Sequence, residues 1–360
     1  MSVRGRAAGV AAASVAVALP LVVDAGGTVL DNATLAAAYV IAALGLNVVV
    51  GFAGLLDLGY VAFFAIGAHV TATFASTYWA DAAGGNGVAV LVGRPTAGLP
   101  GIHVNFVLVL VLAVVAATTA GVLIGIPTLR LRGAYVGIVT LAFGEVIGQV
   151  AANGQDIHLF GGTLTDGPNG ITPIDSIDLP LLAPFGPLDL RPWYWFALAL
   201  LGLTLLVTFR LRDSRLGRAW IALRDDEQAA ASAGVPIAGT KLRAYGVGAA
   251  LGGVTGAFLA SYLRTVNPAQ FTFSFSIFIL VMVVLGGLGS IWGVVLGAIV
   301  VAEINAVLLP RVLNDAPAAL GLDFDLSSVA SGVYGLLLLL VVLLRPEGLL
   351  PERRTARRGR

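Results

Sequence analysis

Ten apolar runs, each near the ~20 residues that a bilayer-spanning helix needs, follow one another along this 360-residue chain. Only 11% of the residues are charged, whereas soluble domains carry about 25%. The sequence therefore predicts an all-α polytopic membrane protein with a single transmembrane domain over residues 1–360. The predicted spans are 7–23, 33–50, 55–77, 104–126, 134–152, 193–210, 241–263, 271–287, 290–309 and 328–345.

The distribution of charge supports ten spans with both termini in the cytoplasm. With the N-terminus inside, seventeen of the twenty-one basic residues fall on the cytoplasmic side, and the four outside are Arg94, Arg191, Arg264 and Arg311. Eleven of the twenty acidic residues fall outside. This is the positive-inside pattern, and an odd number of spans would place the basic tail 346–360 on the wrong side.

Two of the spans allow another interpretation. Residues 7–23 follow Arg4 and Arg6 as a signal peptide would, although an uncleaved first helix is preferred because nine spans come after it. Residues 271–287 are short and end in glycine, so they form either a full crossing or a re-entrant half-helix. The outer loops 78–103 and 153–192 are rich in turn-forming residues, and they are either simple connectors or a docking surface.

Ser214–Gly234 is the one long polar segment with helix-forming character. Asp225 is predicted to be a helix N-cap with Gln228 reaching back to it. Gly234 fits a left-handed C-terminal cap, and Pro236 prevents continuation. Leu216, Trp220 and Leu223 share one helical face. We expect a short, bounded helix outside the bilayer, with this face either inserted into a groove of a partner or, for Trp220, placed at the lipid interface.

Three acidic residues and one histidine lie inside predicted spans. Asp57 and Glu303 are near span ends and are interpreted as solvated carboxylates, and His69 is expected to have a structural hydrogen bond. Glu145 is close to the middle of span 134–152, where an acidic charge costs about 2.5–3.5 kcal/mol on insertion scales. Glu145 is therefore expected either to line a transport pathway or to make a buried structural hydrogen bond.

Glycines recur at four-residue intervals in several spans, as they do where helix backbones approach closely in lipid. Tight helix packing is the preferred interpretation, and pore lining is the alternative. The residues are Gly248, Gly252, Gly256, Gly289, Gly293 and Gly297.

Several kinds of chemistry are excluded or unsupported. The chain has no cysteine, and its three histidines are widely separated, so no metal site is predicted. Lys241 is the only lysine and no Walker A motif is present, so we expect any energy to come from another subunit or an ion gradient. No clustered nucleophile set is visible, and no interaction with nucleic acid is predicted.

An ordered set of segments resembles the permease subunits of branched-chain amino acid ABC importers, specifically the longer, M-type (LivM-like) permease. The segments are LLDLGYVAFFAIGAHVTA (56–73), LRLRGAYVGIVTLAFGEVI (129–147), GGTLTDGPNGI (161–171), 214–258, 267–298 and LRPEGLLP (344–351). Together they cover most of the chain from residue 45 onward. Each segment alone is moderately specific, and the ordered set is highly specific.

The resemblance implies a type II importer-like permease in the cytoplasmic (inner) membrane, without catalytic residues or a cofactor of its own. ATP would be bound by two cytosolic ATPase subunits, and the other partners would be a second, H-type permease, an extracytoplasmic solute-binding protein and the lipid bilayer. It also implies a coupling (EAA-like) loop at 211–240. The coupling residues would be Arg215, Gly217, Arg218, Trp220, Arg224, Asp225, Asp226, Glu227, Ala229, Ala230 and Gly234.

The function expected is therefore import of branched-chain or other neutral amino acids, with Phe64, Tyr135, Thr140, Phe143 and Glu145 as candidate pathway residues. Two alternatives stay open at this point. One is an M-type permease for urea or short amides, and the other is a stand-alone ion-coupled secondary transporter. The latter class uses broken helices with charges converging at mid-membrane, where only Glu145 is central here.

Overall fold

The structure, a computed structural model, describes residues 16–80, 87–92, 99–131, 133–159, 162–178, 184–308, 330–345 and 347–350. The predicted first span, 7–23, lies outside these residues except for its last part, in which 16–22 are helical. The basic tail 346–360 also lies outside them, apart from 347–350.

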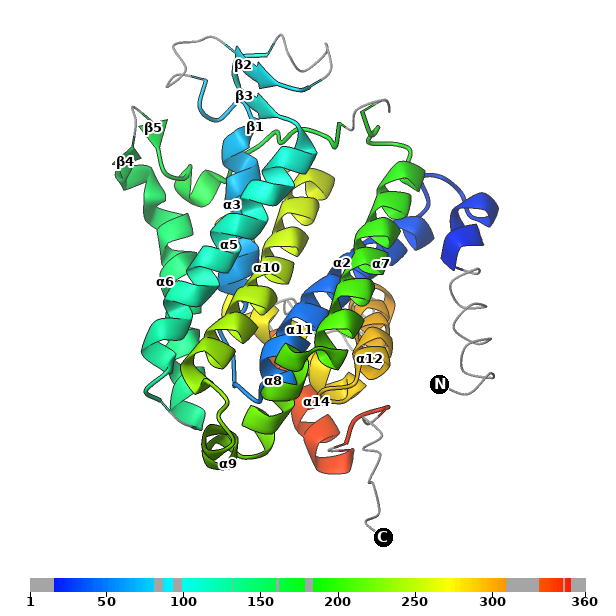
Figure 1. Cartoon of the computed structure of the whole chain (residues 1–360). Coiled ribbons are helices and arrows are strands. Elements are labelled where there is room, and N and C mark those ends of the chain that lie inside the picture. The colour runs from blue at the N-terminus through cyan, green and yellow to red at the C-terminus, as the bar shows by residue number, and fades with distance from the viewer. Residues whose placement is uncertain are drawn as a thin grey trace, which may run out of the picture.

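Two helices form the centre of the bundle. α2 (Thr28–Asn47) continues into a π-helical turn, η1 (Val48–Phe52), and most residues of this apolar segment are buried. α10 (Ile237–Leu263) packs against α2, α3 (Val61–Phe74) and α5 (Phe106–Thr128) (Figure 1). Apart from Lys241 and Arg243 near the start of α10 and Asp31 in the first turn of α2, both central helices are predominantly apolar around their circumference, as expected for helices surrounded by other helices.

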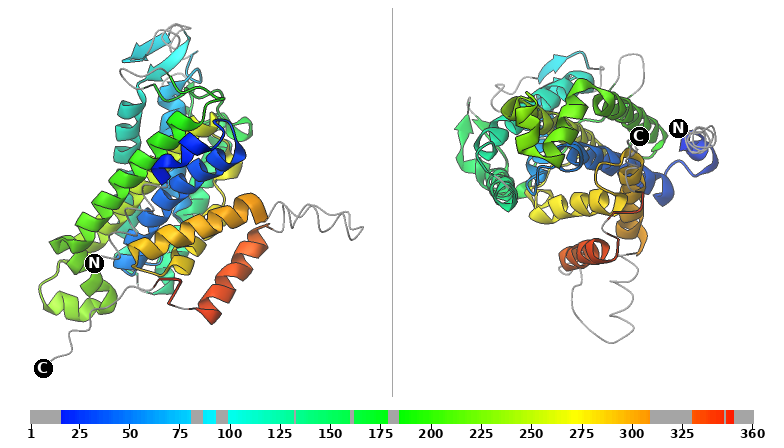
Figure 2. Two further views of the ribbon diagram at one scale, coloured as in Figure 1. Left: turned by 90° about the vertical axis from the view of Figure 1, so that its right-hand side faces the viewer. Right: turned by 60° about the horizontal axis from the view of Figure 1, so that its bottom comes forward.

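The remaining long helices enclose this centre (Figure 2). α7 (Arg191–Asp213) and α12 (Ile291–Glu303) contact α2, and α12 continues as a π-helical turn, η5 (Ile304–Leu308). α11 (Phe273–Gly286) contacts α12 and α14 (Ala330–Leu344). α6 (Ala134–Asn153) lies at the edge of the bundle against α3 and α5.

Six of the helical segments in the described residues are long and apolar enough to cross a membrane: Thr28–Phe52, Phe106–Thr128, Ala134–Asp156, Arg191–Asp213, Ile237–Leu263 and Pro268–Gly286. Each coincides with a predicted span. Val61–Phe74 and Ile291–Val307 are apolar but shorter. The predicted span 55–77 is shorter because residues 53–60 form an irregular segment rather than a helix. Pro268–Gly286 has the length of a full crossing, so its length does not require a half-helix.

The glycines of α10 and α12 lie at close helix contacts. An added Cβ at Gly252 would lie 2.8 Å from Phe63 Cβ, and one at Gly256 would overlap the backbone of α3. Gly248 faces Val49, whereas Gly293 and Gly297 face the backbone of α11. The prediction for Gly289 is wrong, because this residue lies in the loop between α11 and α12 with a φ of +84°. There its N–H donates to Asn47 Oδ1 at 2.9 Å.

One end of the bundle carries short strands, and we call it the sheet end. β1 (Ala75–Ser76) pairs antiparallel with β3 (Gly101–Val104), which pairs parallel with β2 (Gly87–Val90). β4 (His158–Leu159) and β5 (Gly162–Thr163) form a second pair. The side chain of His103 is fully buried and lies 2.7 Å from Asp175, whose pKa is raised by burial against the opposing effect of that contact. The described parts of the predicted turn-rich loops thus form a small layer of short strands.

Candidate functional site

The polar segment Ser214–Gly234 forms two helices at the opposite end of the bundle, which we call the α9 end. They are α8 (Arg215–Asp225) and α9 (Glu227–Ser232). Ser214 caps α8 by accepting from the N–H groups of Leu216 and Gly217. The predicted N-cap at Asp225 is wrong by one residue, because Asp226 accepts from Gln228 N at 2.8 Å and Ala229 N at 3.0 Å. Two Asp residues stand side by side, and the second one has the extended backbone that a cap requires.

The end of α9 agrees with the prediction. Gly234 has a φ of +83°, its N–H donates to Ala231 O at 3.0 Å, and the N–H of Val235 donates to Ala230 O. This is a left-handed glycine cap that satisfies the last carbonyls of the helix. The segment is therefore bounded as expected, but it is a pair of helices rather than a single one.

The apolar face of α8 points into the chain itself. Trp220 has no exposed surface and donates from Nε1 to Thr240 O at 2.9 Å, and Leu223 is 5% exposed. The expectation that this face enters a groove of a partner, or places Trp220 at the lipid interface, is therefore wrong. Burying this face attaches α8 to the start of α10, and a fully buried Trp with a satisfied N–H makes that attachment firm.

A buried ion pair makes a second attachment between the polar helices and α10. Lys241 Nζ lies 2.8 Å from Glu227 Oε1, and the lysine side chain is 4% exposed while that of the glutamate is 35% exposed. A buried ammonium requires such a partner because desolvation otherwise disfavours its charge. The only lysine of the chain thus fixes the N-terminus of α9.

Arg224 connects α8 to the point at which α2 ends. Its guanidinium donates to the carbonyl oxygen of Gly51, and its aliphatic stem lies against Gly54, where an added Cβ would be 2.6 Å from Arg224 Cγ. Gly54 has a φ of +70°, a conformation that favours glycine. Through this contact α8 touches the π-helical turn of the most buried helix.

A cavity of about 410 Å³ lies beside this contact. Its walls come from residues 53–56, from the segment leading into α6, from the residues that join α8 and α9, and from Lys241. Asp57 lies just beyond it and is 2% exposed, with Oδ1 accepting from Gly59 N at 3.0 Å. The interpretation of Asp57 as a solvated carboxylate is therefore wrong, whereas the side chain of Glu303 is exposed.

The candidate coupling residues divide into a buried set and an exposed set. Gly217, Trp220 and Ala230 are buried, and Arg224 and Glu227 are partly buried with the contacts described above. The others form the surface of α8 and α9 at the extreme end of the molecule (Figure 1). That surface, which we call the α8–α9 surface, comprises Arg215, Arg218, Asp225, Asp226, Ala229 and Gly234.

α6 approaches the bundle most closely near the α9 end. Gly59 faces the backbone of Thr140 so closely that an added Cβ would overlap the Thr140 carbonyl oxygen. Thr140 Oγ1 accepts from Leu58 N at 3.0 Å and donates to Gly137 O at 3.0 Å. These contacts hold α6 against the segment that carries Asp57.

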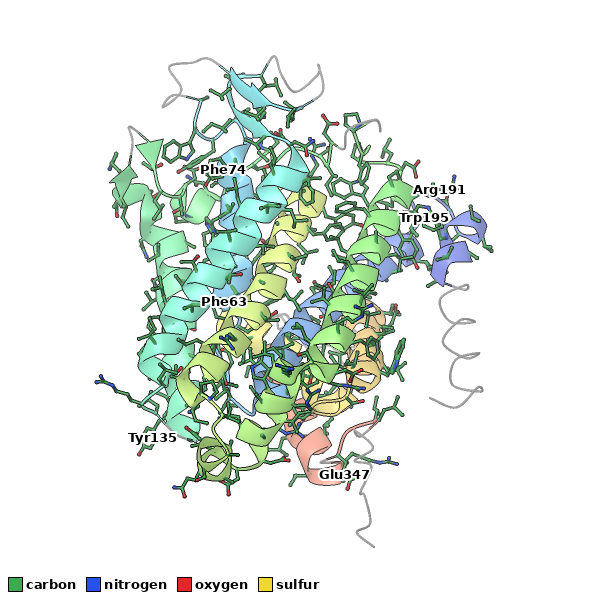
Figure 3. All side chains as sticks on the ribbon, in the orientation of Figure 1. Phe63, Phe74, Tyr135, Arg191, Trp195 and Glu347 are labelled. Atoms are coloured by element: carbon green, nitrogen blue, oxygen red, sulfur yellow. The ribbon has the colours of Figure 1, made fainter. Side chains whose placement is uncertain are left out.

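The opposite face of α6 is exposed and carries polar groups along its length. Its exposed residues recur every three or four positions, which places them on one helical face. Tyr135 is 70% exposed at the edge of the bundle (Figure 3). Glu145 is exposed near the middle of the helix, so the alternative of a buried structural hydrogen bond is wrong. This α6 stripe comprises Tyr135, Ile138, Ala142, Glu145, Gln149 and Asn153.

The candidate pathway residues therefore do not form one surface. Tyr135 and Glu145 belong to the α6 stripe, whereas Thr140 is buried in the contact with Gly59. Phe64 is 4% exposed and stacks on Phe275 with ring centroids 4.7 Å apart, and Phe143 packs partly buried against the core.

Sequence reasoning missed the irregular segment between α2 and α3. Gly51, Gly54 and Gly59 each lie against a backbone or side chain that leaves no room for a Cβ. The glycine spacing in GFAGLLDLG (51–59) was a visible signal, because glycines this dense interrupt a helix. The helix contact with Arg224, which is distant in sequence, had no such signal.

Comparison with known proteins gives a consistent result. The family model for the branched-chain amino acid transport system / permease component matches residues 28–342. The chain is 37% identical to the high-affinity branched-chain amino acid transport system permease protein LivM of Escherichia coli K12, over 94% of this chain and 73% of that protein. It is 26% identical to a probable LivM permease of Methanocaldococcus jannaschii over 86% of this chain and 84% of that protein. It is also 30% identical to the LivH permease of Salmonella typhimurium, over 44% of this chain and 46% of that protein. No solved structure matches this chain.

Proposed function

This chain belongs to the branched-chain amino acid transport permease family, and we propose that it is the M-type membrane subunit of an ABC importer for branched-chain amino acids. In this proposal it has no ATPase site or cofactor of its own. Two cytosolic ATPases bind ATP, and an extracytoplasmic binding protein delivers the solute. The proposed topology is a ten-helix, type II importer-like permease in the inner membrane, with the α9 end in the cytoplasm.

The observation that carries the coupling part of the proposal is the contact of Arg224 with Gly51 and Gly54. A partner that pushes on α8 moves the end of α2 through this contact, because Trp220 and Lys241 prevent α8 and α9 from moving independently of α10. The motion continues through residues 53–60 to the contact of Gly59 with α6. The exposed α8–α9 surface is the proposed docking site for an ATPase.

The α6 stripe supports a second permease as a partner. A carboxylate at mid-bilayer costs about 2.5–3.5 kcal/mol, so Glu145 should face a cavity or another protein rather than lipid. Because LivM and LivH proteins are both relatives of this chain, the proposed neighbour is a homologous permease of the second type. The translocation path then runs between the two subunits, with Glu145 and Gln149 on its wall.

A paired substitution tests the docking site. Ala229→Arg adds a long cation to the α8–α9 surface, and Ala89→Arg makes the same change on exposed β2 at the sheet end. We expect Ala229→Arg to abolish co-purification of the ATPases and ATP-driven uptake of L-leucine, and Ala89→Arg to retain the ATPases. Strong L-leucine uptake by this chain alone in proteoliposomes would contradict the proposal.

A further inference from the structure

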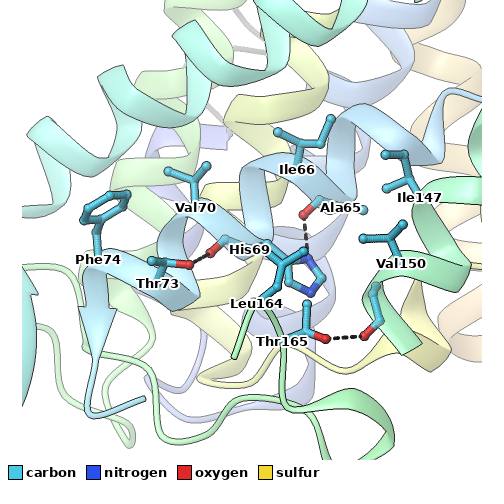
Figure 4. Close-up of a pocket in the computed structure, with 11 residues that line it drawn as sticks. Ala65, Ile66, His69, Val70, Thr73, Phe74, Ile147, Val150, Leu164 and Thr165 are labelled. Atoms are coloured by element: carbon cyan, nitrogen blue, oxygen red, sulfur yellow. Dashed lines mark hydrogen bonds between the residues drawn. The ribbon is translucent and has the colours of Figure 1, made fainter. Parts of the chain in front are cut away.

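A second cavity lies between α3 and α6 in the half of the bundle nearer the sheet end. Its volume is about 250 Å³, and its walls are almost entirely apolar side chains of the two helices (Figure 4). Leu164 and Thr165 border it on the side of the sheet end. An ordered water needs two to four polar partners, and this lining offers too few of them to hold a cluster of waters. The cavity suits a ligand whose buried part is mostly apolar.

His69 places one polar atom in this apolar space. Its Nδ1 lies 2.9 Å from Ala65 O, and a carbonyl oxygen only accepts, so Nδ1 carries the proton. In the neutral tautomer that this bond selects, Nε2 is an acceptor. Figure 4 shows the ring inside the cavity with its second nitrogen pointing away from Ala65 and towards Thr165. The imidazole also contacts the ring of Phe271, with centroids 5.1 Å apart and an angle of 49° between the ring planes.

The two hydroxyls in the cavity wall have already used their hydrogens. Thr73 Oγ1 donates to His69 O at 2.8 Å, and Thr165 Oγ1 donates to Ala151 O at 2.8 Å. The polar side chains described around the cavity therefore offer acceptors only. A ligand that fits must combine an aliphatic group with N–H donors, and it must keep any carboxylate outside because the lining has no side-chain donor for one.

We infer that this cavity, which we call the His69 pocket, binds the transported amino acid with its branched alkyl chain and ammonium group inside and its carboxylate at the mouth. The inference rests on the proposed function and adds a site and an orientation to it. His69 Nε2 accepts a hydrogen bond from the ammonium group, and the side chains of Ile66, Val70, Ile147 and Val150 surround the alkyl chain. The binding is non-covalent. The selectivity that it requires is a higher affinity for amino acids with branched side chains than for amino acids with small ones.

Binding to the full-length chain in nanodiscs tests the site directly. The probe is radiolabelled L-leucine, displaced either by 3-methylbutylamine, which keeps the ammonium group, or by 4-methylpentanoate, which keeps the carboxylate. We expect the amine to compete and the acid not to compete. Equal competition by the acid would overturn the orientation. Labelling of the cavity by a photoreactive phospholipid chain, with no L-leucine binding, would overturn the ligand in favour of lipid.

Three variants locate the site. Val150→Phe fills the pocket, and Val115→Phe makes the same change on α5, where Val115 is 57% exposed. We expect the first to lower the preference for L-leucine over L-alanine by about tenfold, and the second to leave it unchanged. His69→Phe keeps an aromatic ring, should abolish competition by the amine, and provides a second test if Val150→Phe fails to fold. Unchanged L-leucine binding in both pocket variants overturns the site.

Uptake by the complete importer separates failure of the pocket from failure of the proposed function. If wild type imports L-leucine with ATP and the pocket variants do so with unchanged preference, the pocket is wrong and the function stands. If wild type imports no L-leucine, the proposed function fails, while the binding measurement on the full-length chain still decides whether the pocket exists.

Discussion

Lys241 Nζ lies 2.8 Å from Glu227 Oε1, and this ion pair ties the first turn of α9 to the start of α10. The lysine is almost fully buried and the glutamate is one-third exposed. Burial of the lysine costs desolvation free energy, and partial exposure of the glutamate lets solvent screen the attraction. The contribution of this pair to the free energy of unfolding therefore lies between that of a surface ion pair and that of a buried one.

Removing one partner of this pair should cost more than removing both. We expect Glu227→Gln to lower the free energy of unfolding by about 1–3 kcal/mol, because it leaves the Lys241 ammonium buried without its counter-charge. The double variant Glu227→Gln, Lys241→Met should recover most of that loss. Thermal unfolding in nanodiscs measures both values. A double variant that is less stable than Glu227→Gln would contradict an interaction between the two side chains.

Glu227→Lys, which places two ammonium groups together, should leave the protein inserted in the membrane but uncouple ATP hydrolysis from uptake. The repulsion separates α9 from α10 and so removes the attachment that transmits motion. Parallel assays of ATP hydrolysis and L-leucine uptake in proteoliposomes measure this, and normal uptake would disprove the coupling role of α9.

Gly234→Val should also uncouple ATP hydrolysis from uptake, but for a reason of backbone conformation. No atom lies within 4 Å of a Cβ added at Gly234, so the substitution causes no clash, but its φ of +83° costs a β-branched residue about 1–3 kcal/mol. Gly234→Asn is the matched control, since asparagine tolerates this conformation. The ratio of ATP hydrolysis to uptake should rise for valine and stay near wild type for asparagine. Equal behaviour of the two variants would exclude the cap as the cause.

Arg224→Lys should impair uptake although it keeps the positive charge. Lysine lacks the planar fork with which the guanidinium contacts Gly51 O beside Gly54, so the contact between α8 and α2 is lost. Arg212→Lys, at the end of α7, is the control because the described contacts of its side chain stay within α7. The guanidinium pairs with Asp213 at 3.3 Å and lies 5.8 Å from the centroid of the Phe209 ring. Rates of L-leucine uptake at equal expression should fall about tenfold for the first variant and remain normal for the second. An equal rate for both would remove Arg224 from the coupling path.

Glu145→Gln tests the α6 stripe. If Glu145 lines the path between two permeases, removing its charge should lower uptake by about tenfold, which corresponds to about 1.4 kcal/mol in the barrier, while expression and assembly stay normal. Uptake at the wild-type level would disprove a pathway role. Loss of the second permease on purification would instead show that Glu145 holds the two subunits together.

Gly59→Ala should destabilise the protein because its methyl group would overlap the Thr140 carbonyl of α6. Overpacking of this kind costs about 1–3 kcal/mol. Gly202→Ala in the interior of α7 has open space around the new Cβ and should stabilise that helix by about 0.5–1 kcal/mol. Opposite signs in thermal unfolding are the expected result. A neutral Gly59→Ala would mean that α6 can move away from α3 at no cost.

Much of the helix arrangement could be predicted because lipid requires long apolar runs. The boundaries of α5, α6 and α7 follow directly from such runs, and the cap at Gly234 follows from the residue type. The glycine rows of α10 and α12 were also informative, since close helix contact in lipid has few other solutions. These features depend on local sequence.

The site was harder to predict because its contacts join residues far apart in sequence. The sequence pattern predicts that Trp220 anchors a partner, but in the structure its N–H donates to Thr240 O within the same chain. Asp57 is predicted to be solvated because it lies near the end of a span. In the structure residues 53–60 are not helical, and the Asp57 side chain is buried. The sequence prediction grouped Thr140 and Phe143 with Glu145 as candidate pathway residues, but these two residues do not lie on the exposed face of α6 that carries Glu145.

The contact of Gly59 with Thr140 also makes α6 a lever with unequal arms. Thr140 is six residues from the start of α6 and thirteen from its end, which gives arms of about 9 and 20 Å. If α6 rotates as a rigid rod about this fulcrum, a displacement near Ala134 is roughly doubled at Asn153. In such a rotation, a small movement beside Arg224 would change the width of the His69 pocket more than the width of the cavity near Gly54.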